Sequence, residues 1–165
     1  MNEEEKGLTE FLVTMAAFNS AKKPNGFKYK NMYEFILKNG NLHKIIEAEY
    51  TPIYKMGKKK ECFTNAYNLV DNFPDKLTYV EGYACSVSIP IYHAWAVSKT
   101  GHVFDPTWNG GKAYYGVEFP LDYVRKTILK RKCWGVIDAW EIGWPLLTGE
   151  DPYPTEGGDK ACIQK

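Results

Sequence analysis

The chain has 165 residues, 44% of them hydrophobic and 15% aromatic, and a net charge of +1 at pH 7. This length and composition predict one domain with enough apolar material for a core. The balanced charge argues against a nucleic-acid-binding protein, which would carry a large electropositive surface. The acidic residues 3–5 do not resemble a signal peptide, and no apolar run approaches the roughly 18 residues of a membrane span. We therefore expect a cytoplasmic protein that does not enter membranes.

Four cysteines are spread through the chain, at positions 62, 85, 133 and 162. Their wide spacing includes no Cys-x-x-Cys pair, which disfavours a zinc ribbon or finger. Without a secretion signal we expect free thiols, one of them reactive. A zinc site made of Cys62, His93 and either His102 or His43 is disfavoured for the same lack of ligand spacing. We expect neither a metal nor a cofactor.

The N-terminal third of the chain is predicted to be helical. An amphipathic helix is expected over residues 7–20, from an apolar stripe at helical spacing: Leu8, Phe11, Leu12 and Met15. A second helix is expected over residues 31–38, ending at Asn39-Gly40. Residues 42–54 are ambiguous, and a short helix around 45–46 followed by an extended stretch over 51–54 is one interpretation.

A third helix is predicted to begin at Cys62. The residues that follow at helical spacing are apolar and place the thiol on the apolar face, in the first turn: Ala66, Leu69, Val70 and Phe73. Free N–H groups and the helix dipole favour negative charge at such a position. Because the thiolate is the nucleophilic form of cysteine, Cys62 is a candidate nucleophile.

Strands are predicted to follow. Residues 77–89 alternate with a period of two, except at Glu81-Gly82, where a bulge or a close backbone approach is expected. Residues 92–97 form a second strand with His93 and Trp95 on one side, and residues 102–105 form a third that Pro106 closes. Another strand at 113–119, a helix at 121–131 and a last strand at 134–143 complete the pattern. The inward residues of that helix are expected to be Val124, Ile128 and Leu129.

These elements predict an α+β fold, in which the helix that carries the nucleophile packs on an antiparallel sheet. A single domain is expected over residues 1–147, with a helical N-terminal part at 1–56 and a catalytic core at 57–147. Residues 148–165 are rich in Pro, Gly, Asp and Glu and are expected to be a loosely ordered tail.

The register of the hairpin after residue 92 decides whether His93 can reach Asp105. With a three-residue loop at 99–101, Ser98 pairs with His102 and Trp95 pairs with Asp105, which makes His93 and Asp105 diagonal neighbours on one face. A loop of two or four residues would put them on opposite faces unless a bulge intervened. The sequence thus permits a Cys–His–Asp triad, in which a carboxylate orients the imidazole that activates the thiol.

Residues 60–108 resemble the core of the transglutaminase-like superfamily, within the wider papain-like group. Four segments carry the resemblance: Glu61-Cys62-Phe63-Thr64-Asn65-Ala66, Val80-Glu81-Gly82-Tyr83-Ala84, His93-Ala94-Trp95-Ala96-Val97 and Val103-Phe104-Asp105-Pro106-Thr107-Trp108. The resemblance implies that Cys62 is the nucleophile, His93 the general base and acid, and Asp105 the residue that orients the imidazole. It also implies acyl transfer from an amide through a thioacyl intermediate.

Two positions depart from the family pattern. Glu61 and Phe63 flank the cysteine where many transglutaminases have Gly or Gln before it and Trp after it, and we expect Glu61 to face solvent because an inward carboxylate would disfavour a thiolate. The second oxyanion donor is also missing, because no Trp precedes position 95 and the only Gln is Gln164. The side chains expected to bind substrate or supply that donor are Trp95, Trp108, Tyr83, Tyr54 and Asn65.

Three functions remain open. The first is a cysteine hydrolase that cleaves a peptide, isopeptide or side-chain amide bond. The second is an acyltransferase or cross-linking transglutaminase with the same triad, and the third is an inactive transglutaminase-like binding module. The expected partner is a peptide, a protein or a small amide, and the small size is compatible with a phage or bacterial effector. The sequence does not indicate an oligomeric state.

Overall fold

The computed structural model describes residues 1–18, 23–45, 54–87 and 89–153. They form a mixed structure of α-helices and one antiparallel sheet, which confirms the α+β class. The elements are α1 (Glu3–Phe18), α2 (Met32–Asn39), β1 (Asn41–Leu42), α3 (Cys62–Asn72), β2 (Leu77–Cys85), β3 (Ile91–Ser98), β4 (Val103–Phe104), β5 (Ala113–Phe119), α4 (Leu121–Arg131), the 3-10 turn η1 (Trp140–Ile142) and α5 (Pro145–Thr148).

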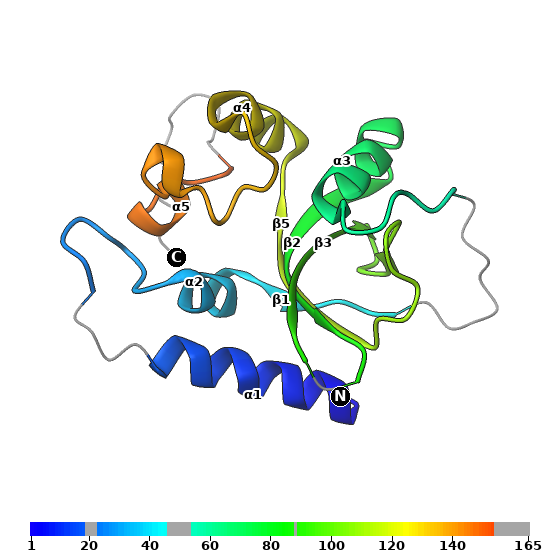
Figure 1. The fold of residues 1–165 in the computed structure, drawn as a ribbon, viewed down its shortest axis with the longest axis horizontal. Coiled ribbons are helices and arrows are strands. Elements are labelled where there is room, and N and C mark those ends of the chain that lie inside the picture. Colours follow the sequence, from blue (N-terminus) through cyan, green and yellow to red (C-terminus); the bar gives the residue numbers. More distant parts are fainter. Residues whose placement is uncertain (19–22, 46–53, 88, 154–165) are drawn as a thin grey trace, which may run out of the picture.

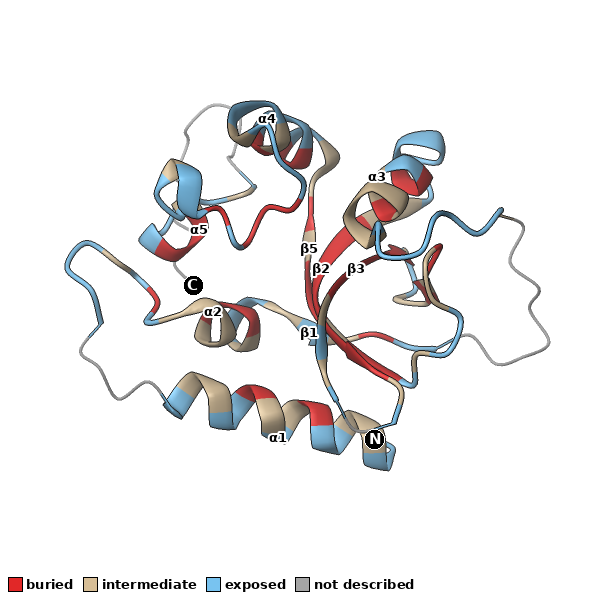
Figure 2. Cartoon of the chain, in the orientation of Figure 1, coloured by how far each residue is buried: buried red, intermediate tan, exposed pale blue. Residues whose placement is uncertain are grey.

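The five strands lie in the order β1-β5-β2-β3-β4, and each neighbouring pair is antiparallel. In Figure 1 the sheet runs through the middle of the molecule, with α3 and α4 beside its upper part and α1 and α2 beside its lower part. Figure 2 shows that burial is concentrated in the central strands and in the chain between α4 and α5. The edge strands β1 and β4 are only two residues long, which leaves little exposed strand edge.

Each face of the sheet has its own core. Residues such as Tyr79, Ala94 and Phe119 face the helices and belong to the main core, to which α1, α2, α3 and α4 all contribute. The opposite face holds a smaller cluster of six buried residues: Val80, Ala84, Trp95, Val97, Val103 and Tyr114. The alternation of side chains along each strand therefore separates the helix-bearing side from a compact second layer.

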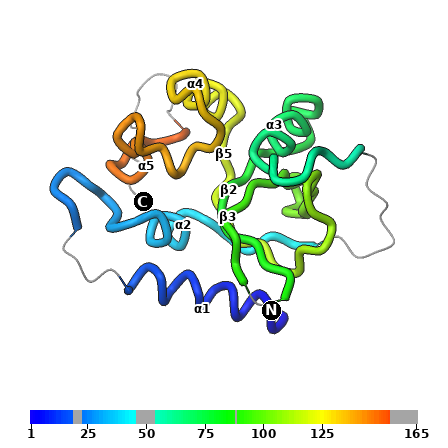
Figure 3. Tube along the Cα trace, viewed as in Figure 1, coloured from blue at the N-terminus to red at the C-terminus, as the bar shows by residue number. Residues whose placement is uncertain are grey.

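The helices begin and end where local side chains satisfy their free backbone groups. Asn2 accepts a hydrogen bond from the Glu5 N–H at 2.7 Å, so α1 begins four residues earlier than the sequence predicts. Asn31 accepts from the Glu34 N–H in the same way and fixes the start of α2. The tube in Figure 3 follows both helices along one side of the sheet. The predicted helices at 31–38 and 121–131 are confirmed.

The predicted last strand at 134–143 is wrong. This stretch is irregular backbone followed by η1, although Val136 and Ile137 are fully buried. Its N–H groups bond to a side chain instead of a strand: Val136 N–H donates to Glu81 Oε1 at 2.7 Å and Ile137 N–H to Glu81 Oε2 at 3.1 Å. The placement of Leu129 on the inner face of α4 is also wrong, since 78% of that residue is exposed.

The predicted strand at 77–89 ends earlier, at Cys85, and has no bulge. Pairing with β3 continues without a break through Glu81↔Ala94 and Gly82↔His93. The interruption marks a close backbone approach, because a Cβ atom on Gly82 would lie 2.2 Å from the Tyr115 carbonyl oxygen on β5. Only glycine lets the two strands meet at this point.

Gly82→Ala is therefore expected to lower the free energy of unfolding by about 2 to 4 kcal/mol, because the added methyl group must push the β2–β5 pair apart. Urea unfolding measures the loss. Gly7→Ala is the matched control: Gly7 lies in α1 with no heavy atom near its Cβ position. It should be neutral or stabilise the protein by up to about 1 kcal/mol. Equal effects of the two substitutions would contradict the close approach.

Some predictions fall outside the described residues. These are the end of the first helix at 19–20, most of the ambiguous segment, and the greater part of the expected tail, residues 154–165. α5 (Pro145–Thr148) ends at the first residue of that expected tail. In the portion of the chain that is described, no helix is long and apolar enough to cross a membrane.

Candidate active site

Cys62 is the first residue of α3 and is partly exposed as a free thiol. Asn65 N–H makes the first hydrogen bond of the helix, to the Glu61 carbonyl at 2.8 Å. The Glu61 side chain makes no cap, and its carboxylate is exposed and lies 3.7 Å from the Lys58 ammonium. This confirms that Glu61 faces solvent. The thiol thus lies where N–H groups of the first turn are free of a side-chain cap.

His93 and Asp105 form the expected pair. The loop of the β3–β4 hairpin is Lys99–Gly101, as shown by the bond from Ser98 N–H to the His102 carbonyl and by the pairing Val97↔Val103. In this register His93 Nε2 lies 2.7 Å from Asp105 Oδ2. Both side chains are buried, with 3% of His93 and 6% of Asp105 exposed. The hairpin alone therefore brings the imidazole and the carboxylate together.

The Asp105 carboxylate is held by four hydrogen bonds. Oδ2 accepts from His93 Nε2 and from the Tyr114 hydroxyl, the latter at 3.0 Å. Oδ1 accepts from the N–H groups of Thr107 at 2.9 Å and Trp108 at 3.0 Å. Because a carboxylate can only accept, the shared proton belongs to His93 Nε2, and Nδ1 is the nitrogen that remains for proton exchange.

The thiol of Cys62 completes the arrangement. β4 pairs only with Ala96 and Val97, so the edge of β3 at His93 is not covered by a strand. Burial lowers the pKa of His93, but hydrogen bonds to Asp105 and Cys62 and the negative charges of both outweigh burial and raise that pKa to about 9. Once the ring has taken the thiol proton, this pKa keeps it an imidazolium at neutral pH. It can later donate that proton to a leaving group.

Tyr114→Phe is expected to lower the free energy of unfolding by about 1.5 to 3 kcal/mol, because it removes a buried hydrogen bond to a charged group. Tyr115→Phe on the same strand is the control. Its hydroxyl donates to the neutral Leu37 carbonyl at 3.3 Å, so its loss should cost only about 0.5 to 1.5 kcal/mol. Urea unfolding of both variants makes the comparison, and a larger loss for Tyr115→Phe would contradict this account of Asp105.

The two predicted tryptophans lie on either side of His93. Trp95 stacks on the imidazole, with ring centroids 6.2 Å apart, and is completely buried. Trp108 meets the imidazole edge-on at 5.8 Å and keeps some exposure. Trp108 is therefore placed to contact a bound molecule, whereas Trp95 has no free surface and instead fixes the ring plane of His93.

Tyr54 and Asn65 lie beside the loop that carries Asp105. Tyr54 packs on Phe104 with centroids 5.9 Å apart, and its pKa is raised to about 12 by burial and by the charge of Asp105, although a hydrogen bond to the Asp105 backbone opposes this rise. The Asn65 amide donates to Thr107 Oγ1 at 2.9 Å and to the Lys58 carbonyl at 2.7 Å. Asn65 thereby links α3 to the loop of the triad carboxylate.

A cavity of about 550 Å³ opens next to these residues. It lies between α3 and the chain that precedes it, and its lining includes Tyr54, Gly57, Asn65, Leu69 and Pro106. A second cavity, of about 530 Å³, lies between α2, β5 and the segment after α5. Neither cavity is lined by Cys62, His93 or Asp105. The first cavity adjoins the triad through Pro106, the residue directly after Asp105.

Tyr83 is not part of this group. Its ring packs against Phe11 of α1, Tyr33 of α2 and Tyr92 of β3, and only 6% of it is exposed. It is a core residue that joins the N-terminal helices to the sheet. Of the eight predicted site residues, the structure thus groups six around His93 and places Tyr83 elsewhere.

Comparisons of the chain with protein-family models, with curated proteins and with solved structures found no match. Within the described ranges, no group of three or more His, Cys, Asp and Glu side chains is placed to hold a metal ion.

Two important residues were not singled out from the sequence. Tyr114, the fourth donor to Asp105, lies in the strand predicted at 113–119 but was given no role there. Glu81 is completely buried and accepts hydrogen bonds from Tyr79 at 2.7 Å and Tyr92 at 2.6 Å, besides the N–H groups of Val136 and Ile137. The available signal was an acidic residue on the inward face of an otherwise apolar strand.

Proposed function

We propose that this protein is a cysteine-dependent hydrolase that cleaves a peptide, isopeptide or side-chain amide bond through a thioacyl intermediate on Cys62. The observation that carries the proposal is the buried His93–Asp105 pair at 2.7 Å, whose free imidazole edge interacts with a partly exposed thiol at the start of a helix. This arrangement matches the requirements of nucleophilic catalysis: a nucleophile, a base and a group that orients the base.

Each proton in the proposed reaction has a place. His93 accepts the thiol proton, and the sulfur attacks the amide carbonyl to form a tetrahedral oxyanion. As the C–N bond breaks, the imidazolium donates its proton to the leaving amine, which departs and leaves a thioester. His93 then takes a proton from water and the hydroxide attacks the thioester. The C–S bond breaks, the carboxylic acid leaves, and the imidazolium returns its proton to the Cys62 sulfur.

The oxyanion is stabilised by N–H groups at the start of α3. The Cys62 N–H is the first donor, because it lies in the uncapped first turn of the helix. The Asn65 side chain is a poor second donor, since its amide hydrogens are used by Thr107 and Lys58. Tyr54 or a neighbouring backbone amide remains as the second donor. The Gln or Trp that supplies this donor in transglutaminase-like proteins has no counterpart upstream of Cys62 in this chain.

The proposal is tested by trapping the thioester. The purified protein is incubated either with an activated ester, p-nitrophenyl acetate, or with peptides whose glutamine side chain is the acyl donor. The reaction is quenched with acid, and the intact mass of the protein is measured. A mass increase on Cys62 that disappears with time in water is the expected result. If added primary amines capture the acyl group faster than water does, the protein is an acyltransferase instead.

Cys62→Ala and Cys133→Ala make a matched pair for this experiment. Cys133 is an exposed thiol outside the site, so its removal should leave acyl turnover unchanged, whereas removal of Cys62 should abolish it. Acylation of Cys133 in preference to Cys62 would overturn the proposal. An acyl-inert Cys62 in a folded protein would favour a binding module.

A further inference from the structure

Three aromatic side chains form a surface beside Cys62 that the proposed catalytic steps do not use. We call Phe63, Tyr67 and Trp134 the aromatic strip. Phe63 follows the nucleophile directly, and Tyr67 lies one helical turn further along α3 on the same face. Trp134 comes from the segment after α4 and meets Tyr67 with ring centroids 5.4 Å apart. All three are partly or largely exposed, and Trp134 is 40% exposed.

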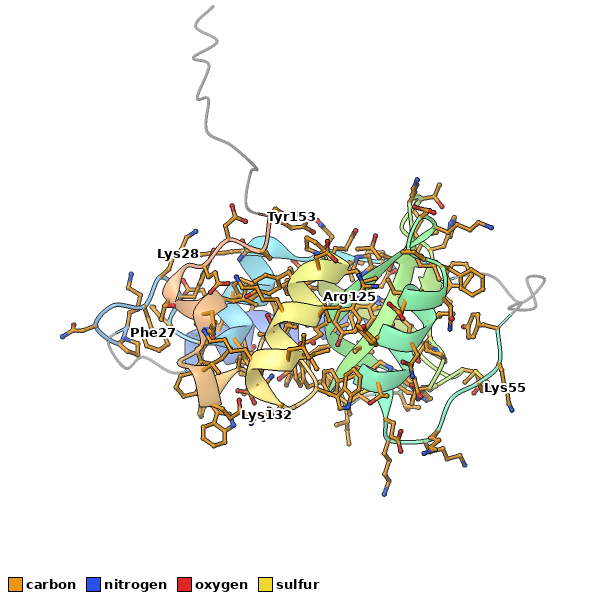
Figure 4. The ribbon with its side chains drawn as sticks, turned by 90° about the horizontal axis from the view of Figure 1, so that it is seen from above. Phe27, Lys28, Lys55, Arg125, Lys132 and Tyr153 are labelled. Carbon is orange, nitrogen blue, oxygen red and sulfur yellow. The ribbon has the colours of Figure 1, made fainter. Side chains whose placement is uncertain are left out.

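Each ring of the aromatic strip is held in place by neighbours. Phe63 packs on Tyr92 of β3, with centroids 5.4 Å apart. The Arg125 guanidinium pairs with Asp71 of α3 and lies close enough to the Tyr67 hydroxyl to interact with it. Figure 4 shows Arg125 on α4 where this helix faces α3. The two rings of α3 are thus fixed from the sheet on one side and from α4 on the other.

The segment that carries Trp134 is anchored on both sides. Arg131 donates to the Gly135 carbonyl at 2.6 Å and forms a bidentate pair with Glu141. Two residues after Trp134, the backbone is bound by the buried Glu81 carboxylate. Gly135 lies against Phe63, since a Cβ atom there would be 3.6 Å from the Phe63 ring. The exposed indole therefore does not result from a loose loop.

We propose that the aromatic strip is the subsite for an apolar or aromatic side chain of the acyl donor, and that Trp134 determines this specificity. The inference rests on the proposed function, because it places the subsite next to the reactive thiol. An indole that stays exposed on a well-anchored segment does not gain the free energy that burial would give. Aromatic side chains fixed in this way are typical of binding surfaces. A substrate ring that covers Trp134 would recover this energy and hold the scissile bond near Cys62.

The test uses two thiol-reactive probes that differ by one phenyl ring, N-acetyl-phenylalanyl and N-acetyl-alanyl chloromethyl ketone. In both, the Cys62 thiolate displaces chloride and forms a thioether, and peptide mapping gives the rate of labelling at Cys62. We expect the phenylalanyl probe to react about tenfold faster, as a well-placed apolar group commonly contributes. Trp134→Ala should bring the ratio of the two rates close to one. Using a ratio cancels any general change in thiol reactivity.

Trp140→Ala is the control, because its indole is 61% exposed but belongs to η1, which packs on α4. This variant should keep the wild-type ratio. A wild-type ratio near one, or a Trp134→Ala protein that keeps the preference, would overturn the inference. Iodoacetamide separates this failure from failure of the proposed function: if Cys62 reacts with it no faster than Cys133, the triad itself is wrong, whatever the ratio of the two larger probes.

Discussion

His93→Ala is expected to slow the alkylation of Cys62 by iodoacetamide at pH 6 by about ten- to a hundredfold, because a thiol without a neighbouring imidazolium is mostly protonated at that pH. In the wild-type protein, the ring lies against both Asp105 and the thiol. The exposed Cys133 thiol gives an internal reference in every sample. Peptide mapping after short exposures measures the two rates side by side.

Asp105→Asn is the companion variant. The amide keeps the shape of the carboxylate but removes the charge that holds the Nε2 proton, so it should reduce the Cys62 rate less than His93→Ala while also changing its pH dependence. If both variants label at the wild-type rate, the proximity of the three side chains has no chemical consequence. In that case the binding-module hypothesis replaces the enzyme.

The pH dependence follows from the direction of the His93 shift. Its pKa is raised from 6.5 to about 9, so the imidazolium survives through the neutral range. Amide turnover needs that proton for the leaving amine and should fall as the pH rises through about 9. The stability that His93 contributes has the same sign: it is fully present below pH 6.5 and is lost as the pH rises through about 9.

Glu81→Ala is expected to cost at least about 3 kcal/mol of unfolding free energy, because it leaves two buried N–H groups and two hydroxyls without an acceptor. In the native protein those donors come from Tyr79, Tyr92, Val136 and Ile137. The Glu81 side chain thereby holds the segment after α4 on the sheet. Urea unfolding, followed by tryptophan fluorescence, gives the loss.

Glu81→Gln separates charge from shape. The amide oxygen still accepts, but its NH2 group faces donors, so a loss smaller than that of Glu81→Ala is expected. Burial raises the pKa of Glu81 above its ordinary 4.5, although the four hydrogen bonds oppose the rise. The folded state therefore binds the proton more tightly than the unfolded chain, and the wild-type protein should lose stability relative to Glu81→Gln as the pH rises above 4.5. A pH-independent difference would contradict a buried ionisable Glu81.

Local patterns in the sequence were sufficient for most of the helices and for the central strands. The pairing of His93 with Asp105 depends on the length of one hairpin loop, which the sequence left open, and the structure has the three-residue loop that permits the pair. The failure at residues 134–143 has a different origin. Apolar residues there suggested a strand, but the partner of their N–H groups is the side chain of Glu81, more than fifty residues away. When a distant side chain replaces a strand as the hydrogen-bond acceptor, the sequence around the donors shows no periodic pattern that would reveal it.

The roles of the aromatic residues were equally hard to separate from sequence. Trp95 and Trp108 follow similar motifs, but one lies under the imidazole and the other at its rim. Tyr83 on β2 and Tyr114 on β5 belong to the cores on opposite sides of the sheet, and only Tyr114 lies on the side where it can bond to Asp105. The alternation along a strand gives the side, but only the assembled sheet tells which side holds the site.

The missing side chain of Gly116 makes room for the indole of Trp95. A Cβ atom at position 116 would lie 2.6 Å from the far edge of that ring and 2.7 Å from the Glu81 carbonyl oxygen, so both the indole and the neighbouring strand need the glycine. In a library selected for folded protein, glycine at 116 should therefore be kept even where the ring at 95 is smaller. Any larger residue at 116 would displace the indole that supports His93, so a change in the second core layer can reach this histidine without touching Cys62 or Asp105.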